Sequence, residues 1–242
     1  MLSERGKQIR RDTLLLARQH GGYHFGGAFS CVEILSSLYD FVLRPEDVFI
    51  LSKGHACWPL YVILRERGLS PRLQSHPHRD VHNGIMWTSG SLGHGFPAAI
   101  GLALSKIHQA LSGRVYVLLG DGECQEGTTW ESLLIAGRRN LRNLTVIVDS
   151  NHIQGSDYTD EVLSISPMIP AAEAAGFICT MVLEGHDERV LTNTLPKNFA
   201  MPHLVFVQTG KGHGVSFMED RPEWHAKWPS EKELALALEE LR

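Results

Sequence analysis

Cysteine is scarce in this sequence, and the few cysteines that are present do not lie in pairs. The four cysteines are far apart and form no Cys-x-x-Cys pair, so the sequence predicts neither a zinc site nor a framework of disulfide bonds. Unpaired thiols of this kind are typical of proteins from a reducing compartment. We therefore expect a cytoplasmic protein.

Long apolar runs, low-complexity tracts and an excess of basic residues are also absent. No run approaches the roughly 18 residues of a membrane-spanning helix, and residues 1–20 lack the continuous apolar core of a signal peptide. The formal net charge is −4, which provides no basic surface of the kind that nucleic acids or anionic membranes require. We expect neither of these partners.

What the sequence does contain is an alternation of helical and strand patterns. Short β-branched or apolar runs predict strands at 48–51, 115–119, 144–148, around 179–185 and at 203–209. Helical spacing predicts an amphipathic first helix with Ser3 as N-cap and one helix over 30–43, whereas the polar segment 69–87 predicts a long loop. The runs 115–119 and 144–148 are too continuously apolar for a half-exposed sheet. The predicted fold class is α/β, with a doubly wound, mainly parallel sheet flanked by helices.

Two of the predicted strands end on small and oxygen-bearing residues. Gly120-Asp121-Gly122 follows the first of them and Asp149-Ser150-Asn151 follows the second, so that Asp121 and Asn151 are 30 positions apart. Gly-Asp-Gly alone is more often a simple turn. Here, however, ligands of an open parallel sheet bind beyond the carboxyl ends of its strands, and oxygen donors are what Mg²⁺ or Ca²⁺ prefers. Because Gly122 also lets the backbone approach a phosphate, the pattern predicts a metal-bound diphosphate.

The segments GDGECQEG and VDSNHIQG resemble the thiamine diphosphate motif of transketolases, in which Gly-Asp-Gly precedes an asparagine by about 30 residues. Other segments resemble the same family in the same order: GGYHFGGAFSCVEIL, DVFILSKGHACWPLYVIL, WTSGSLGHGFPAAIGLAL and GKGHGVSFMEDRPEWHAK. The last of these is similar to a segment typical of split transketolases. The resemblance covers nearly the whole chain, and it implies that residues 1–242 form a single diphosphate-binding domain of the thiamine diphosphate-binding fold.

The resemblance also implies a set of site residues, transferred position by position. The residues that it implies for holding Mg²⁺, or Ca²⁺ as a substitute, are Asp121 and Asn151 through their side chains and Ile153 through its carbonyl group. Those that it implies for binding thiamine diphosphate are His55, Gly90, Leu92, Gly122, Glu123 and Asn151. Those that it implies for catalysis are His24, His76, His225 and Glu126.

Some of these residues have an open alternative. His24 matches a histidine that faces the substrate hydroxyls, and His225 matches one near the diphosphate and the substrate. His76 matches the loop histidine of the family, but the loop is one residue longer here, so His78 is a second candidate and an ordinary surface histidine is a third reading. Glu126 matches a glutamate of a proton network across a subunit interface, although an acidic residue is also favoured at the start of any helix. His186 matches a family pattern whose role is structural.

The resemblance predicts a partner chain as well. In this family a separate pyrimidine-binding domain supplies the glutamate that activates the cofactor, and that domain does not follow here. We expect it on a second, carboxyl-terminal transketolase-like subunit, in a heterodimer that doubles to α2β2. A small-molecule ketose is the expected substrate.

The sequence also departs from the family pattern. Tyr23 replaces a small residue before the substrate histidine, Trp87 is bulky at its position, and Ala226 replaces a glycine. The segments 39–51 and 189–207 are shorter than their counterparts. These changes put the ordinary ketose phosphate specificity in question.

The function that these features predict is the thiamine diphosphate- and Mg²⁺-dependent transfer of a two-carbon ketol unit, by one subunit of a two-component enzyme. A first alternative is a two-component enzyme that loads a two-carbon unit onto a lipoyl or carrier-protein thioester, which would make a carrier protein a partner. A second alternative, of another class, is a non-catalytic cofactor-binding scaffold or regulatory subunit.

Overall fold

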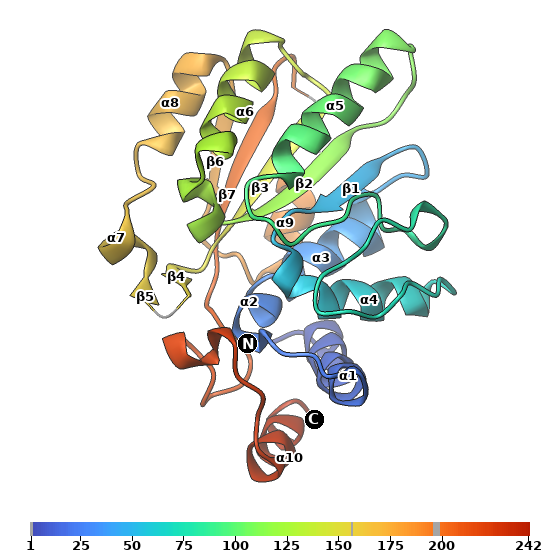
Figure 1. Ribbon diagram of the computed structural model, residues 1–242, viewed down its shortest axis with the longest axis vertical. Coiled ribbons are helices and arrows are strands. Elements are labelled where there is room, and N and C mark those ends of the chain that lie inside the picture. Colours follow the sequence, from blue (N-terminus) through green and yellow to red (C-terminus); the bar gives the residue numbers. More distant parts are fainter. Residues whose placement is uncertain (1, 156, 196–198) are drawn as a thin grey trace.

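The computed structural model describes residues 2–155, 157–195 and 199–242. Its main sheet has five parallel strands in the order β1-β2-β3-β7-β6 (Figure 1), and β4 and β5 form a separate antiparallel pair. The strands are β1 (Val48–Leu51), β2 (Val115–Gly120), β3 (Leu144–Ser150), β4 (Ile153–Gln154), β5 (Asp157–Tyr158), β6 (Ile178–Val182) and β7 (His203–Gln208). The predicted α/β class with a mainly parallel sheet is confirmed.

Helices cover both faces of this sheet (Figure 1). One face is covered by α5 (Gly95–His108), α6 (Gly127–Arg138) and α8 (Met168–Ala175). The helices on the other side are α1 (Glu4–His20), α2 (Phe25–Ser30), α3 (Val32–Ser37), α4 (Cys57–Glu66) and α9 (Glu188–Thr194). The last helix, α10 (Glu231–Glu240), packs on α1, farther from the sheet (Figure 1). The remaining helix, α7 (Thr159–Val162), is a single short turn after β5. The fold is therefore doubly wound around one sheet.

Side chains of the central strands alternate between two apolar cores. Along β2, Tyr116 and Leu118 pack into the core under α1 to α4, while Val115, Val117 and Leu119 pack into the core under α5, α6 and α8. Every residue of β2 is buried. This double burial explains why the run is apolar at each position instead of every second one.

Helix boundaries follow local rules in one place and depart from the prediction in another. Ser3 caps α1 as expected, because its hydroxyl oxygen accepts the N–H of Gly6 at 3.0 Å. The helix predicted over 30–43 is confirmed from Val32, where α3 begins, through the π-helical turn that follows directly over Leu38–Val42, but its start differs because Ser30 belongs to α2. The break lies at Cys31, whose φ and ψ of −103° and 12° leave the helical region, while the apolar spacing continues through it.

The segment 69–87 is the predicted long loop, with one short 3₁₀ turn at Val81–Asn83. All four cysteines are free thiols. None of the helices in the described part of the chain is long and apolar enough to cross a membrane.

Two helical glycines test how closely α6 and α8 pack. A methyl group on Gly137 of α6 would lie 2.1 Å from the carbonyl oxygen of Ala175, whereas one on Gly101 of α5 would meet nothing within 4 Å. We expect Gly101→Ala to raise the free energy of unfolding by roughly 0.5–1 kcal/mol, because alanine favours helix over glycine. Gly137→Ala should lower it by about 1–3 kcal/mol, because the helices must move apart. Urea unfolding of both variants measures this, and a stabilised Gly137→Ala variant would show that the two helices are not in close contact.

Candidate functional site

The carboxyl ends of β2 and β3 lie side by side and carry two of the predicted metal ligands. Gly120 of β2 pairs with Asp149 of β3 in the parallel register, so Asp121 and Asn151 follow at the same edge of the sheet. Their side chains are buried, with exposed fractions of 3% and 5%. The structure therefore brings the two residues together, as their positions after the strands predict.

Backbone N–H groups of the turns after β2 and β3 orient these side chains. The Asp121 carboxylate accepts the N–H of Gly122 at 2.8 Å and the N–H of His152 at 2.6 Å. The amide oxygen of Asn151 accepts the N–H of Ile153 at 3.2 Å. Each oxygen keeps a lone pair for a further partner.

The chemistry of this donor set fits Mg²⁺. It offers one carboxylate, one amide oxygen and, at Ile153, one carbonyl oxygen, which is the hard set that Mg²⁺ takes when phosphate oxygens and water complete the octahedron. Burial raises the pKa of Asp121 and the charge of Asp149 raises it further, so a cation here would relieve an unfavourable buried charge. In the part of the chain that the structure describes, no three His, Cys, Asp or Glu side chains gather as a metal-binding group, as expected for a set with a single carboxylate.

Behind this edge, a buried ion pair joins Lys53, which follows β1, to Asp149 of β3. Asp149 also accepts hydrogen bonds from Ser30 at 2.6 Å and from Thr209, and the Lys53 ammonium donates to the carbonyl of Gly27 at 2.9 Å. Burial opposes both charges, but the partner charge outweighs it, so the pKa of Lys53 is raised and that of Asp149 is lowered. The pair therefore stays ionised and fixes the strand end that carries Asn151.

Glu123 holds the glycine-rich loop before α5 against the sheet. One of its carboxylate oxygens accepts the N–H of Gly93 at 2.8 Å and the hydroxyl of Ser52, and the other accepts the N–H of Gly120 at 3.1 Å. The loop also contains the predicted cofactor residues Gly90, which is exposed, and Leu92, which is half-buried. These bonds show that Glu123 has a structural role. Contact with a cofactor stays a prediction for Glu123, Gly90 and Leu92.

Gly122 lies under a close contact that explains why glycine is needed there. A methyl group at this position would lie 2.4 Å from the amide oxygen of Gln154, the residue after Ile153. A larger residue would therefore push apart the two turns that carry Asp121 and Ile153.

Four predicted histidines form one cluster beside this edge. The ring centre of His24 lies 5.5 Å from that of His55, 6.1 Å from that of His76 and 5.3 Å from that of His225. His76 also contacts the position where a Gly90 side chain would lie, at 3.7 Å. His78 is exposed and belongs to no such contact in the described chain, so the structure favours His76 of the two loop candidates.

The histidines of this cluster are held uncharged. Burial, together with neighbouring positive charges, lowers the pKa of His24 and of His225 to about 4 and that of His55 well below its usual value. The Nδ1 atom of His24 is buried and has no hydrogen-bond partner among the described residues. The backbone of His24 is left-handed, with a φ of 68°, a conformation that costs energy for a residue other than glycine. An unpaired polar atom in a strained turn is a common feature of ligand sites.

Lys211 also belongs to the site, although the sequence patterns did not indicate it. Its ammonium group donates to the carbonyl of Ile153 at 2.7 Å and lies 3.1 Å from Nδ1 of His225. Burial and the charge of Lys53 lower the pKa of Lys211 to about 8, although Asp121 and Asp149 oppose this. Lys211 thus connects the candidate metal ligands to the histidines, and its place between two glycines in GKGHG was the available signal.

Glu126 lies apart from the histidine cluster. Its side chain is exposed at the start of α6, and no hydrogen bond of that side chain is found in the described part of the chain. This position leaves its carboxylate open to solvent or to another chain.

Comparison with known proteins identifies the family of this chain. The family model for the transketolase thiamine diphosphate-binding domain matches residues 17–241. One subunit of the apulose-4-phosphate transketolase of Actinobacillus succinogenes is 38% identical over 100% of this chain and 96% of its own length. The 6-deoxy-6-sulfo-D-fructose transketolase subunit SqwG of a Clostridium species is 31% identical over 99% and 96%.

Full-length transketolases match over less than half of their length. Mouse transketolase is 30% identical over 97% of this chain but only 41% of its own length. Among solved structures, transketolase from Leishmania mexicana superposes with a TM-score of 0.88 at 24% identity, covering 100% of this chain and 41% of that one. The latter similarity supports the fold.

The low pKa values of the histidines predict an acid-sensitive stability. Because the folded pKa of His24 is about 4 and the usual value is 6.5, the unfolded state binds a proton that the folded state does not between these pH values. The free energy of unfolding should therefore fall as the pH falls from 6.5 towards 4, and it should fall less steeply in His24→Gln. Urea unfolding at several pH values tests this, with the exposed His82→Gln as control. An equal decline in the wild type and in His24→Gln would contradict the burial of a neutral His24.

Proposed function

The chain belongs to the transketolase family, as a thiamine diphosphate-binding domain, and from this membership we propose that it transfers a two-carbon ketol unit as one subunit of a two-chain, Mg²⁺-dependent enzyme. The observation that carries the proposal is the arrangement at one edge of the sheet. Oxygen donors from two strand ends, the Lys211 ammonium and four neutral histidines lie there together.

Asp121, Asn151 and the carbonyl of Ile153 would hold the metal ion, and through it the diphosphate. Bound there, thiamine diphosphate would supply the carbon nucleophile for cleaving and forming carbon–carbon bonds. The Lys211 ammonium is buried and pairs with no carboxylate within hydrogen-bond distance among the described residues. Burial removes the hydration that stabilises the charged ammonium, and an anionic group beside it would stabilise the charge in place of water. Lys211 is therefore the cation that we assign to the diphosphate.

The histidine cluster would act on the substrate. With pKa values of about 4, His24 and His225 are neutral at pH 7, so each ring can accept a hydrogen bond from a substrate hydroxyl. The ring nitrogen of His225 that faces Lys211 accepts from it, which leaves the opposite nitrogen for a ligand.

A second subunit is part of the proposal. This chain spans 96% of a relative named as a transketolase subunit but 41% of mouse transketolase, which supports a pyrimidine-binding domain on another chain. The exposed Glu126 is suited to a subunit interface. We propose an α2β2 assembly in the cytoplasm, where free thiols persist.

The substrate class that we propose is a ketose with an anionic end. The names of two relatives specify such donors, a ketose phosphate and a sulfonated fructose. Tyr23, which lies with its ring 4.2 Å from that of His24, and the exposed Trp87 differ from the family pattern near the substrate side. Because of these two residues, we expect a donor other than the common ketose phosphates.

Donor use by the reconstituted pair tests the function. The chain, its partner subunit, thiamine diphosphate and Mg²⁺ are supplied with an aldose phosphate acceptor and a series of anionic ketoses that includes a common ketose phosphate, apulose 4-phosphate and 6-deoxy-6-sulfo-D-fructose, or with pyruvate and a lipoyl acceptor. We expect the aldehyde product of C–C cleavage with a ketose of this series and none with pyruvate. Turnover of pyruvate alone would favour the thioester-loading alternative. Cofactor binding without cleavage of any donor would favour the scaffold alternative.

Asp121→Asn serves as the matched variant in this experiment. It keeps the shape of the side chain and removes the charge that would face the metal, so we expect the Mg²⁺-dependent affinity for thiamine diphosphate to weaken at least about tenfold. Asp160→Asn changes an exposed carboxylate of α7 in the same way and should leave the affinity unchanged. An unchanged affinity in Asp121→Asn would contradict the metal assignment.

A further inference from the structure

His186 bridges the helical layer and the loop that carries Lys211. It lies between β6 and α9, with Nδ1 at 2.8 Å from the carboxylate of Glu33 in α3 and Nε2 at 2.9 Å from the backbone N–H of Gly210. Because a backbone N–H can only donate, Nε2 must be unprotonated and Nδ1 must carry the hydrogen. The two contacts together require a neutral ring in one tautomer.

The Glu33 end of this bridge is rigid. Arg10 of α1 binds both carboxylate oxygens of Glu33, at 2.5 and 2.8 Å, and both side chains are buried. Burial alone would raise the pKa of Glu33, but Arg10, with help from His186, lowers it to about 2. Glu33 is therefore ionised at any physiological pH, and it orients the imidazole as a carboxylate orients a catalytic histidine.

The Gly210 end of the bridge determines where Lys211 lies. Gly210 directly precedes Lys211, whose ammonium reaches the carbonyl of Ile153. On the other side of Lys211, the N–H of Gly212 donates to the carbonyl of Gly26 at 2.9 Å, next to the histidine cluster. On the amino-terminal side of Lys211, the hydrogen bond between Gly210 and His186 is therefore the nearest bond by which a side chain supports this loop.

A second histidine covers the face of the His186 ring. The rings of His186 and His213 are stacked, with centres 3.7 Å apart and planes at 21°. Nδ1 of His213 lies 2.8 Å from Glu219, and its carbonyl accepts from Arg10 at 2.6 Å. Burial lowers the pKa of His213 to about 4, a positive charge on His186 would lower it further, and the Arg10 guanidinium also lowers it. The stack therefore favours two uncharged rings.

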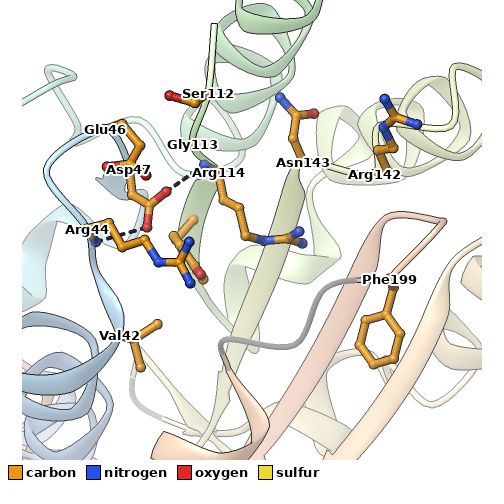
Figure 2. Close-up of a pocket in the computed structure, with 11 residues that line it drawn as sticks. Val42, Arg44, Glu46, Asp47, Ser112, Gly113, Arg114, Arg142, Asn143 and Phe199 are labelled. Carbon is orange, nitrogen blue, oxygen red and sulfur yellow. Dashed lines mark hydrogen bonds between the residues drawn. The ribbon is translucent and has the colours of Figure 1, made fainter.

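Protons from solvent can reach the pair. His186 and His213 line a surface hollow of about 890 Å³, and their side chains are 21% and 28% exposed. A different hollow, lined by Arg44, Asp47 and Arg114 (Figure 2), is separate from this network. The charged groups that surround the two histidines are Arg10 of α1, Glu33 of α3, Glu184, Asp187, Glu188 and Arg189 beside His186, and Glu219 and Asp220 after His213.

We propose that His186 is a positioning residue for the cofactor site: its neutral, Nδ1-protonated ring joins Glu33 to the Gly210 N–H and so holds the Lys211 ammonium in place, until protonation of Nε2 releases the loop. The inference rests on the proposed function for the role of Lys211. Once Nε2 carries a hydrogen, two donors face each other at Gly210, while the charged ring stays paired with the Glu33 carboxylate. Acid therefore loosens the loop and weakens binding of the diphosphate.

Two substitutions separate the two ends of the bridge. The amide of His186→Asn matches the position of Nδ1, so it keeps the donor to Glu33 and loses the acceptor for Gly210. The amide of His186→Gln reaches the position of Nε2, so it keeps an acceptor for Gly210 that cannot be protonated in this pH range. Neither residue adds a charge.

Hydrogen exchange of the full chain without its partner gives the first readout. In the wild type, exchange of the segment 209–215, corrected for the intrinsic pH dependence, should increase as the pH falls from 7.5 to 5.5. It should be raised about tenfold at pH 7.5 in His186→Asn, which corresponds to one lost hydrogen bond, and should stay flat with pH in His186→Gln. If His186→Gln shows the same pH dependence as the wild type, or His186→Asn exchanges like the wild type, the proposal is overturned.

Affinity of the two-subunit complex for thiamine diphosphate with Mg²⁺ gives the second readout. We expect about tenfold weaker binding for His186→Asn at pH 7.5, and an acid-dependent loss in the wild type that His186→Gln lacks. Groups that titrate far from His186 do so in both proteins, so the difference reports on His186 and on His213, the ring stacked against it. If the loop opens in His186→Asn while cofactor affinity stays the same, the positioning of the loop holds and the assignment of Lys211 under the proposed function fails.

Discussion

The buried ion pair between Lys53 and Asp149 is the interaction on which the rest of this site depends. It joins four segments that are distant in sequence: the end of β1, the end of β3, the start of the segment after β7 through Thr209, and α2 through Gly27 and Ser30. Removing one partner of such a pair would leave an uncompensated buried charge, which costs roughly 3–5 kcal/mol. The hydrogen bonds around the pair satisfy the remaining polar atoms, and this makes the charges tolerable. Because Asp149 precedes Asn151 by two residues, the same pair fixes the strand end that presents the candidate metal ligands.

The site that results is complete on one side only. Oxygen donors, the Lys211 ammonium and the neutral histidines all come from this chain, and they line the carboxyl edge of a parallel sheet, where α/β proteins bind their ligands. Beyond this edge, the carboxylate of Glu126 is exposed. Support for the loop comes from behind, through Arg10, Glu33 and His186. This buried network anchors the Lys211 loop, and the exposed Glu126 is the residue at which we propose that a second protein chain adjoins the site.

Sequence patterns predicted β1, β2, β3 and β7 well because these strands are buried at nearly every residue, so their apolar runs stand out from the polar turns around them. They also predicted the more exposed β6, but not the short pair of β4 and β5. They also predicted that Asp121 and Asn151 meet, since residues after adjacent parallel strands must share an edge. They could not predict the contacts of Lys53, Lys211 and His186, because each joins segments that only the folded chain brings together. For the same reason, the choice between His76 and His78 depended on the path of a long loop, and the break at Cys31 was hidden by apolar spacing that continues through it.

The central claim is that this chain provides one half of a thiamine diphosphate site that a partner subunit completes. Calorimetric titration of thiamine diphosphate with Mg²⁺, into the chain alone and into the chain mixed with its partner, tests that claim most directly. We expect weak or undetectable binding to the chain alone and saturable binding that is at least about tenfold tighter in the mixture, a difference of roughly 1.4 kcal/mol or more. Equal affinity with and without the partner, or no binding by a folded and assembled pair, would contradict it.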